Sequence, residues 1–123
     1  MLKFYKCAHC SNLVVKLVDS GVSLDCCGQA MVELTANTED AAVEKHVPVV
    51  TKTDTGIHVV VGEVEHPMTE EHLIDCIVVD KGDSFEVAKL DPSKPPVADF
   101  ALLDSEEVKG VYAYCNLHGL WKD

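Results

Sequence analysis

Four cysteines within the first 27 residues decide what the N-terminal part of this chain can fold into. Cys7 and Cys10 form a Cys-x-x-Cys motif, and fifteen residues separate Cys10 from the adjacent pair Cys26 and Cys27. Segments below about 40 residues bury too little apolar surface to fold alone, and they usually need a metal or disulfides. We therefore expect residues 1–36 to form a small domain that the four cysteines hold together.

We predict that these four cysteines bind one metal ion, in preference to forming disulfides or remaining as buried free thiols. Four soft thiolates suit zinc or iron in near-tetrahedral geometry. The N-terminus "MLKFYKCAHC" lacks a signal-peptide pattern, so we expect a cytoplasmic protein, and disulfides are rare in that compartment. Side chains of adjacent residues diverge, so the Cys26–Cys27 pair must be distorted to share a metal. His9 is expected to be a solvent-facing loop residue.

From residue 47 onward the pattern is that of β-structure. Runs such as "VPVVTK", "IHVVVGEV" and "GVYAYCN" are rich in Val, Ile and aromatic residues, and turn sequences such as "TDTG" and "DKGD" separate them. About seven strands at this spacing, with no convincing helix, predict an antiparallel β-sandwich. We interpret the acidic segment "TANTEDAAVEKH" as the linker. The predicted fold class is therefore all-β, with a small metal-binding domain at 1–36 and a sandwich at 37–123.

The charge of the chain excludes some partners. It carries 21 Asp and Glu against 10 Lys and Arg, a formal net charge of −11. Nucleic acids and anionic membrane surfaces require clustered Lys and Arg, so neither is expected as a partner. Apolar stretches such as "VPVV" and "CIVV" are far too short to span a bilayer.

A second group of metal-ligand residues lies in the predicted sandwich. Each member stands at an expected strand end or loop, where side chains from distant parts of a β fold can meet; the members are His46, His66, His72, Cys115 and His118. We expect His46 to lie in an extended segment, because Pro48 follows shortly after it. The group predicts a site with mixed imidazole and thiolate ligands.

Taken together, these motifs resemble a known family. "YKCAHC…LDCCGQAM", "EKHVPVV", "VEHPMTEEHLI" and "YCNLHGLWK" closely resemble the desulfoferrodoxins, the two-iron class of superoxide reductases, in the same order over essentially the whole chain. The resemblance implies a desulforedoxin-like domain with a four-cysteine iron at 1–36. It also implies a seven-stranded immunoglobulin-like β-sandwich with the catalytic iron at 37–123, and thus two iron ions per chain.

The resemblance also implies roles for individual residues. The catalytic iron would have four equatorial imidazoles, an axial thiolate and an open sixth position, the ligands being His46, His66, His72, His118 and Cys115. Glu44 would close the sixth position in the oxidised state, and Lys45 would lie beside the open face. The implied reaction is the one-electron reduction of superoxide to hydrogen peroxide without oxygen release. A rubredoxin-like electron donor and a homodimer are implied as well.

Local charge should govern the capture of superoxide. The net charge of −11 repels an anion, but salt screens that field beyond about 8–10 Å. A ferrous ion with one thiolate is locally positive, and Lys45 adds to this charge.

Three further residues have expected places. Cys76 in "LIDCIVV" is expected to be a small core residue of a strand. Trp121, the only tryptophan, is expected to pack near the site. His58 in "GIHVVV" should lie on an exposed strand face.

Four alternatives remain open at the level of sequence. Cys115 could be a nucleophile with His118 as its base, although three histidines would then be unexplained. A zinc-binding structural protein accounts for the cysteines, but the second group exceeds the four ligands that zinc usually takes. An electron carrier would need both irons but no open coordination position. A superoxide dismutase would differ only in oxidising a second superoxide.

Overall fold

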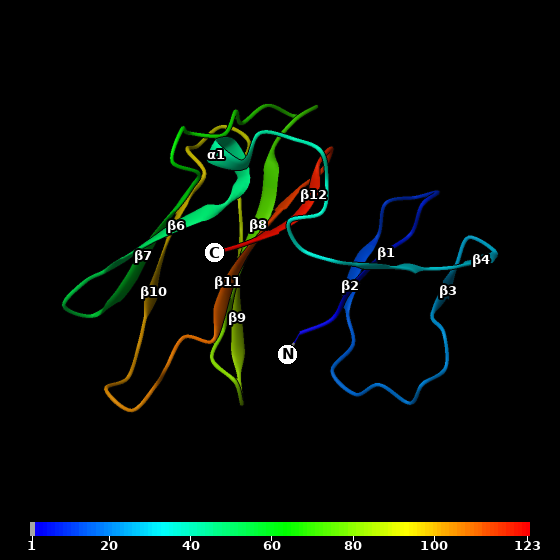
Figure 1. Ribbon diagram of the computed structural model, residues 1–123, viewed down its shortest axis with the longest axis horizontal. Helices are drawn as coiled ribbons and strands as arrows, with labels where there is room; N and C mark the ends of the chain where they lie inside the picture. The colour runs from blue at the N-terminus through cyan, green and yellow to red at the C-terminus, as the bar shows by residue number, and fades with distance from the viewer. Residues whose placement is uncertain (1) are drawn as a thin grey trace. The chain divides into compact units, whose positions relative to one another are not determined.

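The computed structural model describes residues 2–123, which form two compact units (Figure 1). The first unit ends at Thr35, and the second runs from Ala36 to Asp123. Both units are built of antiparallel strands, and α1 (Val43–His46) is the one helix among the described residues. No helix in residues 2–123 has the length and apolar character needed to cross a membrane.

The N-terminal unit consists of very short strands. Its three-stranded sheet has the order β2-β1-β5, formed by β1 (Phe4–Lys6), β2 (Leu13–Val15) and β5 (Val32–Leu34). A separate hairpin joins β3 (Asp25–Cys26) to β4 (Gln29–Ala30). Strands of two or three residues bury little apolar surface, so this unit needs another source of stability.

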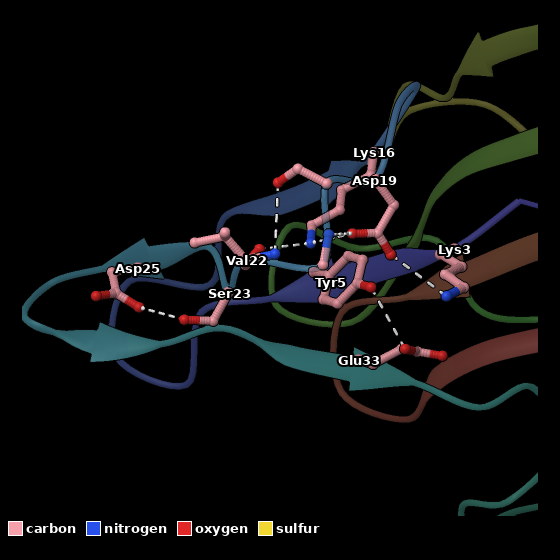
Figure 2. A network of polar contacts seen from close by, with 10 residues as sticks. Lys3, Tyr5, Lys16, Asp19, Val22, Ser23, Asp25 and Glu33 are labelled. Atoms are coloured by element: carbon pink, nitrogen blue, oxygen red, sulfur yellow. Dashed lines mark hydrogen bonds and ion pairs between the residues drawn. The ribbon is translucent and has the colours of Figure 1, made fainter.

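Polar contacts on the surface of this unit do not supply that stability. Asp19 accepts hydrogen bonds from the Lys16 ammonium at 3.0 Å and the Gly21 amide at 2.9 Å, and Lys3 lies 3.4 Å from it (Figure 2). The Gly21 amide and then Lys16 lower the pKa of Asp19 to about 2. Exposed ion pairs of this kind contribute little to stability, because water and salt screen the charges.

The C-terminal unit is a β-sandwich of seven strands, as the sequence predicted. One sheet has the order β10-β7-β6, from β6 (Pro48–Lys52), β7 (Gly56–Val61) and β10 (Val97–Ala101). The other has the order β12-β11-β8-β9, from β8 (Ile74–Asp80), β9 (Phe85–Lys89), β11 (Gly110–Cys115) and β12 (Gly119–Lys122). Every pairing is antiparallel.

The hydrophobic core lies between these two sheets. In β7 the alternate residues Ile57, Val59 and Val61 are buried, as the period of two along a strand requires. They belong to one cluster with core residues of β8 and β11, which include Cys115. One ligand of the predicted site is therefore anchored in the sandwich core itself.

The interpretation of residues 35–46 as a linker was wrong for residues 36–46. These residues belong to the second unit, where Asn37 pairs with the outer edge of β12: the Lys122 amide donates to Asn37 Oδ1 at 2.8 Å, and Asn37 Nδ2 donates to the Lys122 carbonyl at 3.0 Å. A single turn of helix, α1, follows, and it is too short to form without tertiary contacts. His46 ends α1 and is not extended, because the restriction imposed by Pro48 falls on its immediate neighbour Val47.

Candidate metal centres

The structure brings together all five residues of the second predicted group. Their ligand atoms lie within 4.8 Å of one another, and the residues are His46, His66, His72, Cys115 and His118. They come from the end of α1, the connection between β7 and β8, the end of β11 and the turn that follows it. Figure 1 shows α1 and the start of β8 at the same end of the sandwich.

A β-bulge aligns Ile74, the first residue of β8, with Cys115. Ile77 and Val79 face the core, so strict alternation would turn Asp75 inward as well. The register shifts between Tyr114 and Cys115, and Cys115 is paired with Ile74. Ile74 therefore joins the core in place of Asp75, and the chain before it continues to His72 on the side of the cluster.

His46 and His66 are held in one orientation by backbone carbonyls. His46 Nδ1 lies 2.6 Å from the Ala42 carbonyl oxygen, and His66 Nδ1 lies 2.7 Å from that of Pro67. A carbonyl only accepts hydrogen bonds, so Nδ1 carries the proton and the Nε2 lone pair is free to bind a metal. Burial lowers the pKa of both imidazoles, that of His66 to about 4. Both rings are therefore neutral near pH 7, as metal ligands must be.

His118 and Cys115 complete one side of the cluster. His118 Nδ1 lies 3.2 Å from His46 Nε2 and 3.9 Å from Cys115 Sγ, and that sulfur is 3.5 Å from His66 Nε2. The His46 proton is on Nδ1, so its Nε2 presents a lone pair toward the ring of His118. Two facing lone pairs repel each other unless a proton or a cation lies between them.

The fourth imidazole has a buried nitrogen without a hydrogen bond. Among the described residues, His72 Nε2 is the one buried side-chain nitrogen or oxygen that lacks a hydrogen-bond partner. Burial is also the main cause that lowers the pKa of His72. A buried polar atom left unsatisfied costs roughly 1–3 kcal/mol, and a metal ion would remove this cost by accepting the lone pair. The five donors thus fit a transition metal that accepts both imidazole and thiolate ligands.

Trp121 packs beside the cluster, as expected from the sequence. Its ring stacks on His46 with 4.9 Å between centroids, and its Nε1–H donates to the His118 carbonyl at 3.0 Å. The buried indole therefore fixes two of the imidazoles relative to β12.

Glu44 and Lys45 are exposed residues of α1, directly before His46. Burial is the largest cause of the lowered pKa values of His46 and His72, and the charge of Lys45 lowers both a little further. Lys45 is thus within electrostatic reach of two imidazoles.

Gly62 allows α1 to lie close to the end of β7, a role that the sequence analysis missed. A Cβ atom at residue 62 would lie 2.7 Å from the Glu44 carbonyl oxygen and 2.8 Å from the Lys45 carbonyl carbon. Backbone atoms cannot move aside as a flexible side chain can, so any larger residue would displace α1. The one signal in the sequence is a glycine that ends the apolar run "IHVVVG".

The four cysteines of the first unit form the other group. The Sγ atoms of Cys7, Cys10, Cys26 and Cys27 lie within 4.8 Å of one another. Cys27 has a φ of 53°, in the left-handed region that residues with a side chain rarely adopt. This conformation supplies the distortion expected of an adjacent cysteine pair.

All four of these thiols can be deprotonated together only when a cation is bound. The amides of Cys10 and His9 each donate to Cys7 Sγ at 3.4 Å, and these bonds lower the pKa of Cys7 to about 6. Hydrogen bonding with Cys10, followed by burial, raises the pKa of Cys27 to about 12. Four thiolates cannot coexist at these distances unless a metal neutralises them. The side chain of His9 is exposed, as predicted.

Two other residues singled out in the sequence lie outside both groups. Cys76 is buried in β8, and burial raises the pKa of its thiol to about 11, which makes it an unreactive core residue. His58 lies on the outer face of β7, and its Nδ1 is 2.7 Å from Asp99 Oδ1.

Comparison with known proteins agrees with this geometry. Residues 38–123 match the family model described as Desulfoferrodoxin. A desulfoferrodoxin of Clostridium acetobutylicum is 47% identical over 121 residues, which cover 98% of this chain and 94% of the relative. The crystal structure of the superoxide reductase from Treponema pallidum superposes with a TM-score of 0.83 at 32% identity, covering 100% of this chain and 98% of that one. The superoxide reductase (1Fe-SOR) from Giardia intestinalis has a TM-score of 0.55 at 34% identity, covering 65% of this chain and 95% of its own. The chain therefore belongs to the desulfoferrodoxin family.

Proposed function

We propose that this protein is a superoxide reductase that binds iron at both groups. The observation that carries the proposal is the convergence of four imidazoles and one buried thiol, with the lone pair of His72 Nε2 unsatisfied. Relatives whose names are superoxide reductase support the choice of substrate. Residues 37–123 would be the catalytic domain, and residues 1–36 would be a desulforedoxin-like domain with the four-cysteine iron.

Each turnover must supply superoxide with one electron and two protons, which together give hydrogen peroxide. When bound, ferrous iron at the five-residue group supplies the electron. Cys115 contributes the only anionic ligand, so the occupied group keeps about one positive charge, which attracts the superoxide anion. Burial lowers the pKa of three of the imidazoles, so His46, His66 and His72 neither add charge nor release protons near pH 7.

Lys45 and Glu44 have different proposed roles on the exposed side of the group. The Lys45 ammonium would attract superoxide and hold a water that donates a proton to it. Glu44 would provide a carboxylate ligand after the electron has been transferred. Both side chains are exposed on α1, and the placement of α1 depends on the close approach of Gly62.

We also propose the remaining partners from the family resemblance. A rubredoxin-like protein would return the electron to the catalytic iron, and the chain would act as a cytoplasmic homodimer.

The product ratio tests the proposed reaction directly. Iron-loaded protein is reduced without oxygen and then receives a limiting dose of superoxide, after which peroxide and remaining ferrous iron are counted. We expect one peroxide for each superoxide consumed, with an equal loss of ferrous iron. One peroxide for every two superoxides, with oxygen released faster than in the uncatalysed decay, would establish a dismutase. Decay at the uncatalysed rate with iron still reduced would favour the electron-carrier or zinc-binding alternative.

Replacing Lys45 with alanine should slow the capture of superoxide. Electrostatic attraction raises association rates by factors of 10 or more, so we expect a second-order rate about tenfold lower and less dependent on salt. Pulse radiolysis at several ionic strengths measures both quantities. Lys94→Ala, which removes the same charge from an exposed loop, is the matched control. An unchanged rate in the Lys45 variant would remove this residue from the mechanism.

A further inference from the structure

Asn116 joins the two segments that carry Cys115 and His72. Its Nδ2 donates to the Glu71 carbonyl at 2.9 Å, and the Leu73 amide donates to its Oδ1 at 3.0 Å. The backbone amide of Asn116 also donates to the Leu73 carbonyl at 3.2 Å. These three hydrogen bonds bracket His72 on both sides.

The side chain of Asn116 continues the pairing of β8 and β11 beyond the end of the regular ladder. That ladder ends where Cys115 pairs with Ile74, directly after the bulge. An amide side chain carries one acceptor and a donor group, so it can pair with a backbone N–H and a backbone C=O at the same time. Glutamine carries the same amide but is one methylene longer, and a serine or threonine hydroxyl has its donor and its acceptor on a single atom.

His72 depends on its backbone for orientation more than His46 and His66 do. Those two rings have Nδ1 fixed by a carbonyl, whereas no such carbonyl contact to His72 is found in residues 2–123. The backbone of His72 is held from one side by Thr69, whose Oγ1 accepts the His72 amide at 3.0 Å and whose own amide donates to the His72 carbonyl at 3.0 Å. Asn116 holds the other side.

We infer that Asn116 is a positioning residue that fixes His72 relative to Cys115 Sγ, so that both can bind the same metal ion. Asn116 directly follows Cys115, so movement of this residue would shift the thiolate and the imidazole against each other. The inference rests on the metal site of the proposed function, but not on superoxide as its substrate.

The test compares metal retention in two variants of Asn116. Asn116→Asp keeps the volume and the acceptor for the Leu73 amide, but it places an oxygen against the Glu71 carbonyl. Asn116→Leu removes both side-chain hydrogen bonds. Loss of a group that orients a metal ligand typically weakens binding 10- to 100-fold, so we expect each variant to release the metal of the histidine site to a chelator about tenfold faster. The absorption band that Cys115 gives with the bound metal should also shift.

Asn37→Asp is the matched control. Asn37 makes the same pair of contacts to a backbone N–H and C=O, at 2.8 and 3.0 Å, but on β12 and not beside His72. We expect Asn37→Asp to lose about as much thermal stability as Asn116→Asp. The rate of metal release and the absorption band should stay as in the parent protein. The four-cysteine metal in each variant serves as an internal reference, because its release should not change.

Two results would overturn the inference. One is that folded Asn116→Asp releases the metal of the histidine site at the parent rate and keeps the absorption band unshifted. The other is that Asn37→Asp accelerates the release of this metal as much as Asn116→Asp does. If the Leu variant does not fold, the isosteric Asp variant decides the question. If superoxide yields no peroxide but the Asn116 variants lose metal faster, the proposed function fails and this inference stands.

Discussion

Cys115→Ser is expected to abolish the formation of peroxide from superoxide while the sandwich remains folded. The Cys115 side chain is fully buried in the core, and it is the only sulfur among the five ligand atoms. A serine hydroxyl stays protonated near pH 7, so the group would lose its one anionic ligand and its affinity for the metal. Loss of a residue that only orients a ligand costs 10- to 100-fold, so loss of the ligand itself should lower the rate at least about a hundredfold.

The matched control for this prediction is Cys76→Ser. Cys76 is nearly as buried as Cys115 and pairs with Tyr114 across β8 and β11, yet it lies outside the metal group. Serine should destabilise the fold at either position, because each buries a hydroxyl. Peroxide formation and metal content, both measured per folded protein, separate the two effects. If the Cys115 variant kept the parent rate per bound iron, the thiolate would not be required.

The sequence allowed the ligand residues to be predicted because each belongs to a motif with chemical meaning. Cys7 and Cys10 share one short turn, and Cys115 and His118 share another, so their spacing is readable without a structure. The sandwich could be predicted from its apolar runs, because a strand with one buried face alternates visibly. This is why the expected ligand residues meet in two groups.

The residues that position those ligands could not be predicted in this way. Asn116 acts through its contacts with residues more than forty positions away, and Gly62 matters only because α1 lies against it. The helix itself depends on tertiary contacts such as the hydrogen bond from the Val64 amide to the Glu44 carbonyl at 2.8 Å. Local propensity carries no information about such contacts, so a single turn of helix in a polar segment was interpreted as a linker.

Removing the metal from the four-cysteine group is expected to unfold residues 2–35 and leave residues 36–123 folded. The strands of the first unit are two or three residues long, and large apolar side chains such as Leu17 and Val18 are exposed at 78% and 89%. A structural metal contributes roughly 10–16 kcal/mol in small metal-binding domains, which exceeds what such a core can supply. We therefore expect Cys10→Ala combined with Cys27→Ala to abolish amide protection throughout β1 to β5.

Hydrogen exchange resolved along the chain measures this outcome, because it reports each unit separately. His9→Ala is the control, since it changes an exposed side chain of the same turn without removing a sulfur ligand. Protection of β1 to β5 that survives the loss of metal would show that hydrogen bonds and the small core suffice to fold this unit.

Superoxide reduction by the double variant, measured with a chemical reductant, then decides the role of the four-cysteine metal. An unchanged rate would mean that the four-cysteine metal only holds its own unit together, because the catalytic group would work without any electron from it.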